Sequence, residues 1–469
     1  MRAVAAQKQQ VALLILLASV GYMTSTMVAT ATTERTLTYV IGTIACILSF
    51  LNAEISIYFL IAAMLLSPEI AVGEKTSGGT LGRSVTLRVD DFVLLIICTT
   101  WFIKSVLYKE IDLLKRTPLN TALFLYAFGA MFSTMLGVMN GNVQVKAGGL
   151  FVLKYIEYFL VYWMVVNTVQ DEGQIKRFVL VAFVVAFIVS VVAIGQIPGG
   201  GRVSAPFEGE AGEPNTLGGY LLFMMCLVGS LVFVKNKYRF PAVALLVVLF
   251  IAFTYTLSRA SYLGLVPALI ILPLVTRRYF VLVGVLAVFL AVGAFAEALL
   301  PKVVYDRLAF TFTQKQSQDK GQIRLYGQKL DTSTSARLFV MQTAISAFYA
   351  KPIFGYGVTG WAFLDSQYFR TLAETGLFGL STLAFLIFRV VQVTLRTMTD
   401  LRDRDPVFFA LSAGFLAGTA GLVVHAVGSN TFIIVRIMEP FWLFAAIIYL
   451  APSVIPRMTA APPVLELSA

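Results

Sequence analysis

Residues 243–253 read VALLVVLFIAF, and residues 279–296 read YFVLVGVLAVFLAVGAFA. Neither run carries a charge, and neither alternates between apolar and polar residues as a half-buried strand does. Such runs cross a bilayer as helices, because a helix satisfies its backbone N–H and C=O groups within its own segment. A membrane β-barrel would instead show short alternating segments. The sequence therefore predicts an all-α polytopic membrane protein.

The composition supports the same fold class. Of 469 residues, 58% are hydrophobic and 13% are charged, and the mean hydropathy is +0.83. Soluble domains are less apolar and more highly charged. The net charge of +11 does not indicate nucleic-acid binding, because no basic cluster is interleaved with aromatic residues on a soluble domain. Cys46, Cys98 and Cys226 lie in apolar runs and predict packing residues, with no disulfide framework or CxxC metal site.

About 12–14 spans of roughly 17–22 residues can be placed on the apolar runs. They lie at residues 11–30, 37–52, 54–71, 92–108, 119–138, 150–168, 178–197, 215–233, 240–257, 261–275, 279–299, 370–392, 407–427 and 431–451. The first run has no convincing cleavage site, so it is predicted to be retained as a span. The expected organisation is eleven spans with short outer loops over 1–299, a large outer loop or cap over 300–369, C-terminal spans over 370–455 and a cytoplasmic tail over 456–469.

Basic residues gather on one side of these spans. With a cytoplasmic N terminus, the cytoplasmic clusters are Lys104, Lys109, Lys115 and Arg116; Lys176 and Arg177; Lys235, Lys237 and Arg239; Arg277 and Arg278; and Arg396, Arg402 and Arg404. This is the excess that cytoplasmic loops carry. The outer side receives residues 73–91, 198–214 and 300–364. The last stretch is too long for a plain connector and is predicted to fold as a cap, where function is expected.

Arg202, Arg259 and Arg337 are predicted on the outer side. Guanidinium groups remain charged and bind phosphate with two parallel hydrogen bonds, so converging arginines would suit a lipid diphosphate. The alternative for each is interfacial snorkelling or a structural ion pair. That alternative is weakest for Arg259, which stands in a very short hairpin between two spans.

Outer carboxylates are the candidates for proton transfer. They are Glu208, Glu210, Glu213, Asp365 and Glu374. Glu208 and Glu210 are expected to be simply solvated. Asp365 and Glu374 bracket the point at which the large loop enters a span, so partial desolvation could tune either as an acid or a base.

The lone histidine, His425, lies near the outer end of a span. It could accept a proton, although a packing histidine bonded to a neighbouring hydroxyl is the favoured interpretation. Arg436 and Glu439 place opposite charges three residues apart and predict an intrahelical pair. The sequence contains no P-loop, no GxGxxG and no His/Cys cluster with metal spacing, so ATP, dinucleotide and metal chemistry have no support.

Several short motifs occur in a fixed order along residues 198–390. They are Arg202 with the run EPNTLG at 213–218, LSRA at 257–260, SAR at 335–337, PIFGYG at 352–357, DSQY at 365–368 and ETGLFG at 374–379. In this set the chain resembles the O-antigen ligase and O-antigen polymerase superfamily of bacterial envelope glycosyltransferases. Each motif alone is weak, and their order and shared outer placement give the resemblance its specificity.

The resemblance implies an enzyme of the bacterial inner membrane with its active site on the periplasmic face. Its partners would be an undecaprenyl-diphosphate-linked oligosaccharide donor, a glycan acceptor, the bilayer and assembly proteins such as a flippase or chain-length regulator, with no nucleic acid and no cofactor. Arg202 and Arg259 would bind the diphosphate, and Asp365 would serve as catalytic base with His425 as the alternative base. The further substrate-binding candidates are Arg337, Tyr368, Arg370, Asn215 and Glu374.

One departure from the ligase pattern favours a polymerase. Ligases that transfer glycan to lipid A core usually carry a histidine where Asp365 stands, whereas an aspartate there is familiar in polymerases. Transfer to another lipid acceptor is the alternative activity. A transporter or flippase of lipid-linked oligosaccharide is the alternative of another class, and it would be expected to show repeats and charged groups near the bilayer midplane.

Overall fold

The computed structural model describes residues 52–67, 69–71, 86–88, 91, 94–95, 98–99, 115–206, 212–299, 302–313, 324–325, 328–329, 332–362 and 364–456. Several sequence predictions lie outside these residues. They are the span 11–30, nearly all of the span 37–52, most of the span 92–108, Cys46, Glu208, Glu210 and almost all of the tail 456–469.

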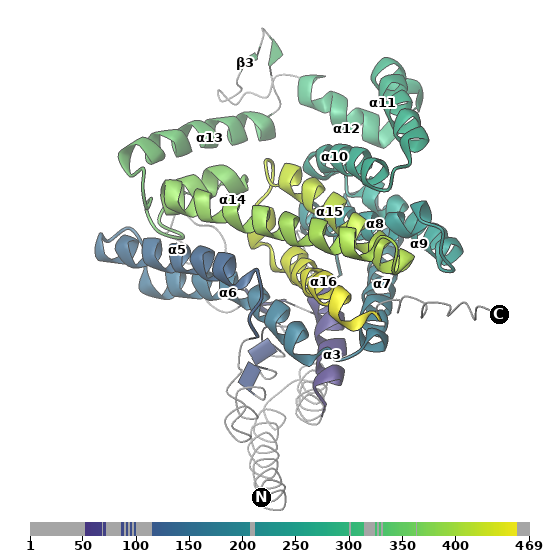
Figure 1. Cartoon of the computed structure of the whole chain (residues 1–469). Helices are drawn as coiled ribbons and strands as arrows, with labels where there is room; N and C mark the ends of the chain where they lie inside the picture. Colours follow the sequence, from purple (N-terminus) through teal and green to yellow (C-terminus); the bar gives the residue numbers. More distant parts are fainter. Residues whose placement is uncertain are drawn as a thin grey trace, which may run out of the picture.

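The described part of the chain is a helical bundle with two small β-hairpins (Figure 1). Its helices are α3 (Ala53–Leu66), α5 (Asn120–Met139), α6 (Val145–Thr168), α7 (Glu172–Gly195), η1 (Ile197–Gly199), α8 (Pro214–Phe233), α9 (Arg239–Tyr255), α10 (Arg259–Val275), α11 (Tyr279–Leu299), α12 (Lys302–Thr313), α13 (Thr332–Ala350), α14 (Gln367–Leu401), α15 (Pro406–His425), η2 (Thr431–Ile433) and α16 (Val435–Val454). Strands β1 (Glu69–Ala71) and β2 (Thr86–Arg88) pair antiparallel, as do β3 (Arg324–Leu325) and β4 (Gln328–Lys329).

The helices confirm the predicted fold class of a multi-pass membrane protein. Within the described residues, seven helices are long and apolar enough to cross a membrane, and four shorter apolar helices accompany them. Local chemistry sets several of their ends. Asp405, for example, accepts hydrogen bonds from the backbone N–H groups of Val407 (2.8 Å) and Phe408 (3.0 Å), and Pro406 follows as the first residue of α15.

Helix α14 begins at Gln367, three residues before the predicted span, and it is interrupted at Gly376. Gly376 has φ 64° and ψ −161°, a conformation that glycine adopts readily. The segment before α14 covers the break: Leu377 N–H donates to Pro352 O (2.8 Å) and Phe378 N–H to Ile353 O (3.1 Å). On the other side of the break, Gly357 N–H donates to Glu374 O (2.7 Å). The first nine residues of α14 are therefore a separate short helix, and only the last six of them fall within the predicted span.

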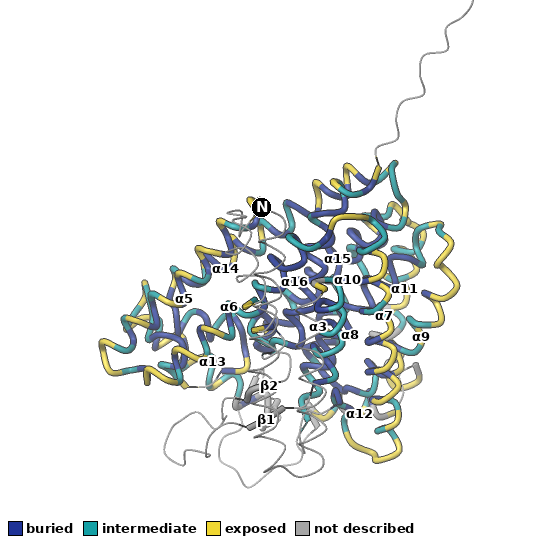
Figure 2. Tube along the Cα trace, turned by 90° about the horizontal axis from the view of Figure 1, so that it is seen from below, coloured by how far each residue is buried: buried dark blue, intermediate teal, exposed yellow. Residues whose placement is uncertain are grey.

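Close helix contacts build the centre of the bundle. Figure 2 shows buried residues concentrated along α8, α15 and α16, with exposed residues on outer helices such as α9 and α11. Glycines on α15 allow this approach, because a Cβ at Gly414 would lie 2.5 Å from Cys226 O of α8 and one at Gly418 would lie 2.8 Å from the Phe223 ring. Small residues let backbones approach within a membrane, where packing rather than hydrophobic exclusion joins helices.

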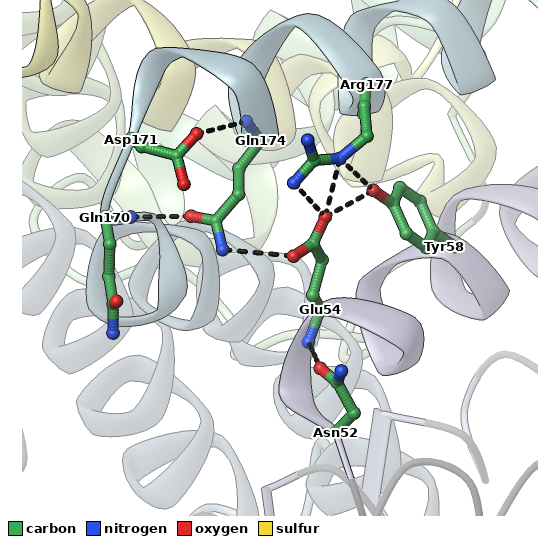
Figure 3. Close-up of polar contacts among 7 residues, drawn as sticks. All are labelled: Asn52, Glu54, Tyr58, Gln170, Asp171, Gln174 and Arg177. Carbon is green, nitrogen blue, oxygen red and sulfur yellow. Dashed lines mark hydrogen bonds and ion pairs between the residues drawn. The ribbon is translucent and has the colours of Figure 1, made fainter.

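The helix ends form two sets, as alternating spans require. At one end, basic side chains from the predicted cytoplasmic clusters contact neighbouring helix ends: Lys115 donates to Val166 O (3.1 Å), Arg278 to Phe233 O (3.1 Å) and Arg404 to Pro452 O (3.2 Å). Figure 3 shows the same pattern where α7 meets α3, with Arg177 Nε donating to Glu54 Oε1 at 2.8 Å. We call this the basic end.

The glycine packing gives a stability prediction. Replacing Gly414 with alanine is expected to lower the free energy of unfolding by about 1–3 kcal/mol, because the new methyl group overlaps α8. Gly149→Ala in α6 is the control, since a Cβ there meets nothing within 4 Å. Thermal unfolding of the two variants in one detergent checks this, and equal melting temperatures would contradict the close packing of α15 on α8.

Candidate functional site

Four segments meet at the end of the bundle opposite the basic end. They are the described parts of the α7–α8 connection (residues 196–206 and 212–213), the α9–α10 hairpin (256–259), the start of α14 (364–368) and the α15–α16 turn (426–434). We call them together the four-segment site. Helices α8, α10, α14 and α16 all begin here. The unpaired N–H groups and positive dipole end of a helix N-terminus favour anions, so this end of the bundle is suited to negative charge.

Arg202 ties the α7–α8 connection to the α9–α10 hairpin. Its Nε donates to Thr256 O at 2.9 Å, and a terminal guanidinium nitrogen donates to Asn215 Oδ1 at 3.0 Å. Asn215 Oδ1 also accepts from Ser258 Oγ at 2.9 Å. The backbone reinforces the contact, because Val203 N–H donates to Tyr255 O at 3.1 Å. Arg202 and Ser258 thus both donate to one amide oxygen, that of Asn215, and this links two of the motifs.

Arg259 is the first residue of α10 and is partly exposed. Ser258 caps this helix by accepting from Ser261 N–H at 3.3 Å, and the preceding Leu257 has a positive φ of 48°. The hairpin packs on the α15–α16 turn, since a Cβ at Gly428 would lie 3.2 Å from Ala260 Cβ. The capped turn and its neighbours fix the backbone that carries Arg259.

Gln367 joins the start of α14 to the α15–α16 turn. Its N–H donates to both Ala426 O (3.0 Å) and Ser429 O (3.2 Å), and its Oε1 accepts from Phe432 N–H (3.1 Å). Asn430 Nδ2 donates in turn to Leu364 O at 2.6 Å. These bonds bring residues 364–368 beside the turn that packs on the Arg259 hairpin.

Asp365 is the exposed carboxylate of the four-segment site. Its side chain is 47% exposed, and Arg337 Nη2 of α13 lies 3.9 Å from its Oδ2. Asp365 and Arg337 therefore face each other where α13 meets the start of α14. Tyr368, one turn further on, uses its hydroxyl to donate to Val423 O at 2.6 Å.

Arg370 and Glu374 form a buried ion pair. Arg370 Nε lies 3.1 Å from Glu374 Oε1, and both side chains are 5% exposed. Glu374 Oε1 also accepts from Thr359 N–H at 3.0 Å. The pair thus connects the short first part of α14 to the segment containing the PIFGYG motif, and neither side chain is open to solvent as Asp365 is.

His425 is fully buried at the end of α15. Its Nδ1 lies 2.7 Å from Thr431 Oγ1, and its ring packs against α8, because a Cβ at Gly219 would lie 3.0 Å from His425 Cε1. The hydroxyl partner is the one expected of a packing histidine. His425 is therefore closed to solvent, whereas Asp365 is open to it.

The structure shows contacts of Arg436, Ser258 and Gln367 that the sequence analysis does not predict. Arg436, for which the sequence predicts an intrahelical pair with Glu439, also donates to Pro206 O (3.0 Å) and Ser67 O (3.4 Å), and so binds backbone carbonyls of two other segments. The roles of Ser258 and Gln367 were missed. A serine before a helical run is a capping signal for Ser258, whereas nothing local identifies Gln367. Among the described residues, no group of three His, Cys, Asp or Glu side chains could hold a metal ion.

The buried pair gives a second stability prediction. Glu374→Gln is expected to lower the free energy of unfolding by about 3 kcal/mol, because it removes the negative charge beside buried Arg370. Glu297→Gln removes an exposed carboxylate of α11 and is the control. Thermal unfolding measures both, and a Glu374→Gln variant as stable as the control would show that the pair does not anchor α14.

Comparison with known proteins agrees with the motifs. Residues 242–384 match the family model described as O-antigen ligase, a stretch that contains Arg259, Arg337 and Asp365 but not Arg202, Asn215 or His425. A search of curated proteins found no match. The family match thus supports the resemblance of this membrane protein to the O-antigen ligase and O-antigen polymerase superfamily.

Proposed function

We propose that the chain is a membrane glycosyltransferase that polymerises undecaprenyl-diphosphate-linked repeat units on the outer face of the bacterial inner membrane. The observation that carries the proposal is the meeting of four helix N-termini with Arg202 and Arg259 at one end of the bundle. Fixed donors and dipoles stabilise developing negative charge best when they are oriented before the reaction starts. A departing lipid diphosphate is an anion of that kind.

The proposed reaction needs three events at one carbon atom. The acceptor hydroxyl oxygen forms a bond to the anomeric carbon of the donor, and the bond between that carbon and the diphosphate oxygen breaks. The acceptor proton goes to Asp365, and the electron pair of the broken bond leaves with undecaprenyl diphosphate beside Arg202 and Arg259. Direct displacement inverts the anomeric configuration. The donor is already activated, so these steps require neither nucleotide nor metal.

Asp365 suits the base role better than the other two candidates. It is 47% exposed and lies 3.9 Å from Arg337, so an acceptor hydroxyl can reach it from solvent. Glu374 is occupied by Arg370 and Thr359. His425 is fully buried, and its Nδ1 is hydrogen-bonded to Thr431 Oγ1. A glycan acceptor, and hence polymerisation, is favoured over lipid transfer because an aspartate stands where ligases carry histidine.

Incubation of the purified protein with a lipid-linked repeat unit tests the proposal. A ladder of products is expected for a polymerase. A single transfer to an added lipid acceptor would indicate the ligase activity instead. If the intact lipid-linked oligosaccharide instead moves across the vesicle membrane and no new glycosidic bond forms, the protein is a transporter and the enzyme proposal is overturned.

Arg259→Ala is expected to lower polymer formation by about a hundredfold to a thousandfold, because it removes a donor to the departing diphosphate. Arg259→Lys should restore only part of the activity, since an ammonium offers a point charge instead of a planar fork. Rates are measured in the same assay, with the exposed Arg396→Ala at the basic end as the matched control. A normal rate for Arg259→Ala would remove this arginine from the reaction.

Asp365→Asn is expected to lower turnover by about a hundredfold or more while the donor still binds, since the amide cannot take the acceptor proton. Asp403→Asn is the control, because this carboxylate is also exposed but lies at the basic end. His425→Gln should retain activity. If His425→Gln is inactive and Asp365→Asn is active, the histidine is the base and the assignment of Asp365 is wrong.

A further inference from the structure

A second feature lies at the basic end, far along the helices from the four-segment site. It is a groove of about 580 Å³ between the first halves of α7 and α9, with the end of α8 and the start of α15 at its base. The volume falls within the range of about 300–1,000 Å³ of ligand pockets. The lining side chains include Phe183, Phe187, Leu231, Leu245, Val248 and Leu411.

The groove is apolar and opens on the outside of the bundle. Leu180, Val184 and Phe187 line it from α7 and are 62%, 47% and 46% exposed in the protein alone. All three lie on a helix that is long and apolar enough to cross a membrane. An apolar groove on the surface of such a helix is suited to a hydrocarbon chain from the surrounding lipid.

Basic side chains lie near one end of the groove, on α7 and on the loop before α9. Lys176 and Arg177 line it from α7, but Glu172 and Glu54 already pair with them. The excess charge comes from the loop before α9, where Lys235, Lys237 and Arg239 are exposed and no acidic residue intervenes. Tyr238 connects this basic loop to the groove. Its side chain lines the groove, and Lys237 Nζ lies 5.1 Å from the centre of its ring.

We propose that this groove binds an anionic phospholipid, with an acyl chain between α7 and α9 and the headgroup phosphate at Lys235, Lys237 and Arg239. The site is separate from the proposed glycosyltransferase reaction, because its mouth is at the end of the helices opposite Arg202 and Arg259. Charge selects the headgroup: basic side chains at a membrane surface attract anionic lipids, and basic pockets between helices on the cytoplasmic side hold their headgroups. A Tyr at the mouth fits the aromatic belt of the same interface.

Lipid retention tests whether the basic side chains select an anionic headgroup. The full-length protein is reconstituted in vesicles of equal phosphatidylglycerol and phosphatidylcholine and extracted in mild detergent, and bound lipid is counted by native mass spectrometry. Phosphatidylglycerol is expected to be retained preferentially. Lys237→Gln should lower the ratio of phosphatidylglycerol to phosphatidylcholine about fivefold, the effect of one basic side chain near the surface. Arg396→Gln, which removes one charge from the same end away from the groove, should leave the ratio unchanged.

Neighbouring residues of α9 test the groove itself. Ala244 lines it and Val243 does not, and both are exposed. Ala244→Phe should fill the groove and remove the retained phosphatidylglycerol, whereas Val243→Phe adds similar bulk outside it and should not. Equal retention of both lipids, or retention unaffected by Ala244→Phe, would overturn the proposal. So would recovery of a polyprenyl phosphate in place of the phospholipid when the protein is purified directly from cells.

Discussion

The geometry of the four-segment site depends on the hydrogen bonds of Gln367. This residue is 2% exposed, and its N–H and side-chain oxygen bind backbone groups of Ala426, Ser429 and Phe432. Water does not compete for these bonds, and breaking them would leave buried polar groups without partners. Gln367 stands two residues after Asp365, so the same bonds fix the carboxylate relative to the α15–α16 turn. The Arg259 hairpin packs on that turn, which places the proposed base and the proposed anion site in one framework.

The break in α14 explains why the strongest motifs lie where they do. The PIFGYG segment contributes backbone groups to both sides of Gly376, and its own Gly355 and Gly357 have φ of 65° and 91°. A Cβ at Gly355 would lie 2.6 Å from the Ala373 and Glu374 carbonyl oxygens. These glycines are therefore required because the backbone of the PIFGYG segment lies directly against the backbone of α14. The motif thus holds the short first part of α14 at its angle to the rest of the helix.

The sequence predicted the apolar helices well because their length and composition are local properties. The span predicted at 215–233 and helix α8 at Pro214–Phe233 differ by one residue, and a proline at the first position marks that start. The start of α14 lies three residues before the predicted start, because tertiary hydrogen bonds of Gln367 and Tyr368 hold these residues and apolar content does not. The carbonyl partners of Arg436 could not be predicted either, because they lie 230 and 369 residues away along the chain.

The same limit applies to the four-segment site. Its arginines and Asp365 could be selected from residue chemistry and predicted topology alone. The shared role of Asn215 could not, because it depends on Arg202 and Ser258 reaching one amide oxygen from separate segments. The structure separates exposed Asp365 from buried Glu374, two carboxylates at the entry to one helix. Burial and pairing distinguish them.

The two ends of the molecule carry positive charge of different kinds, and the difference fits the two roles proposed. At the four-segment site the charge comes from helix N-termini and from Arg202, whose guanidinium is already held by Thr256 and Asn215. Groups fixed in this way stabilise charge that appears during a reaction without reorganising. At the basic end it comes from exposed lysines on flexible stems at Lys235 and Lys237. Such side chains attract a surface anion over about a Debye length but impose little geometry on it, which suits retention of a lipid headgroup rather than catalysis.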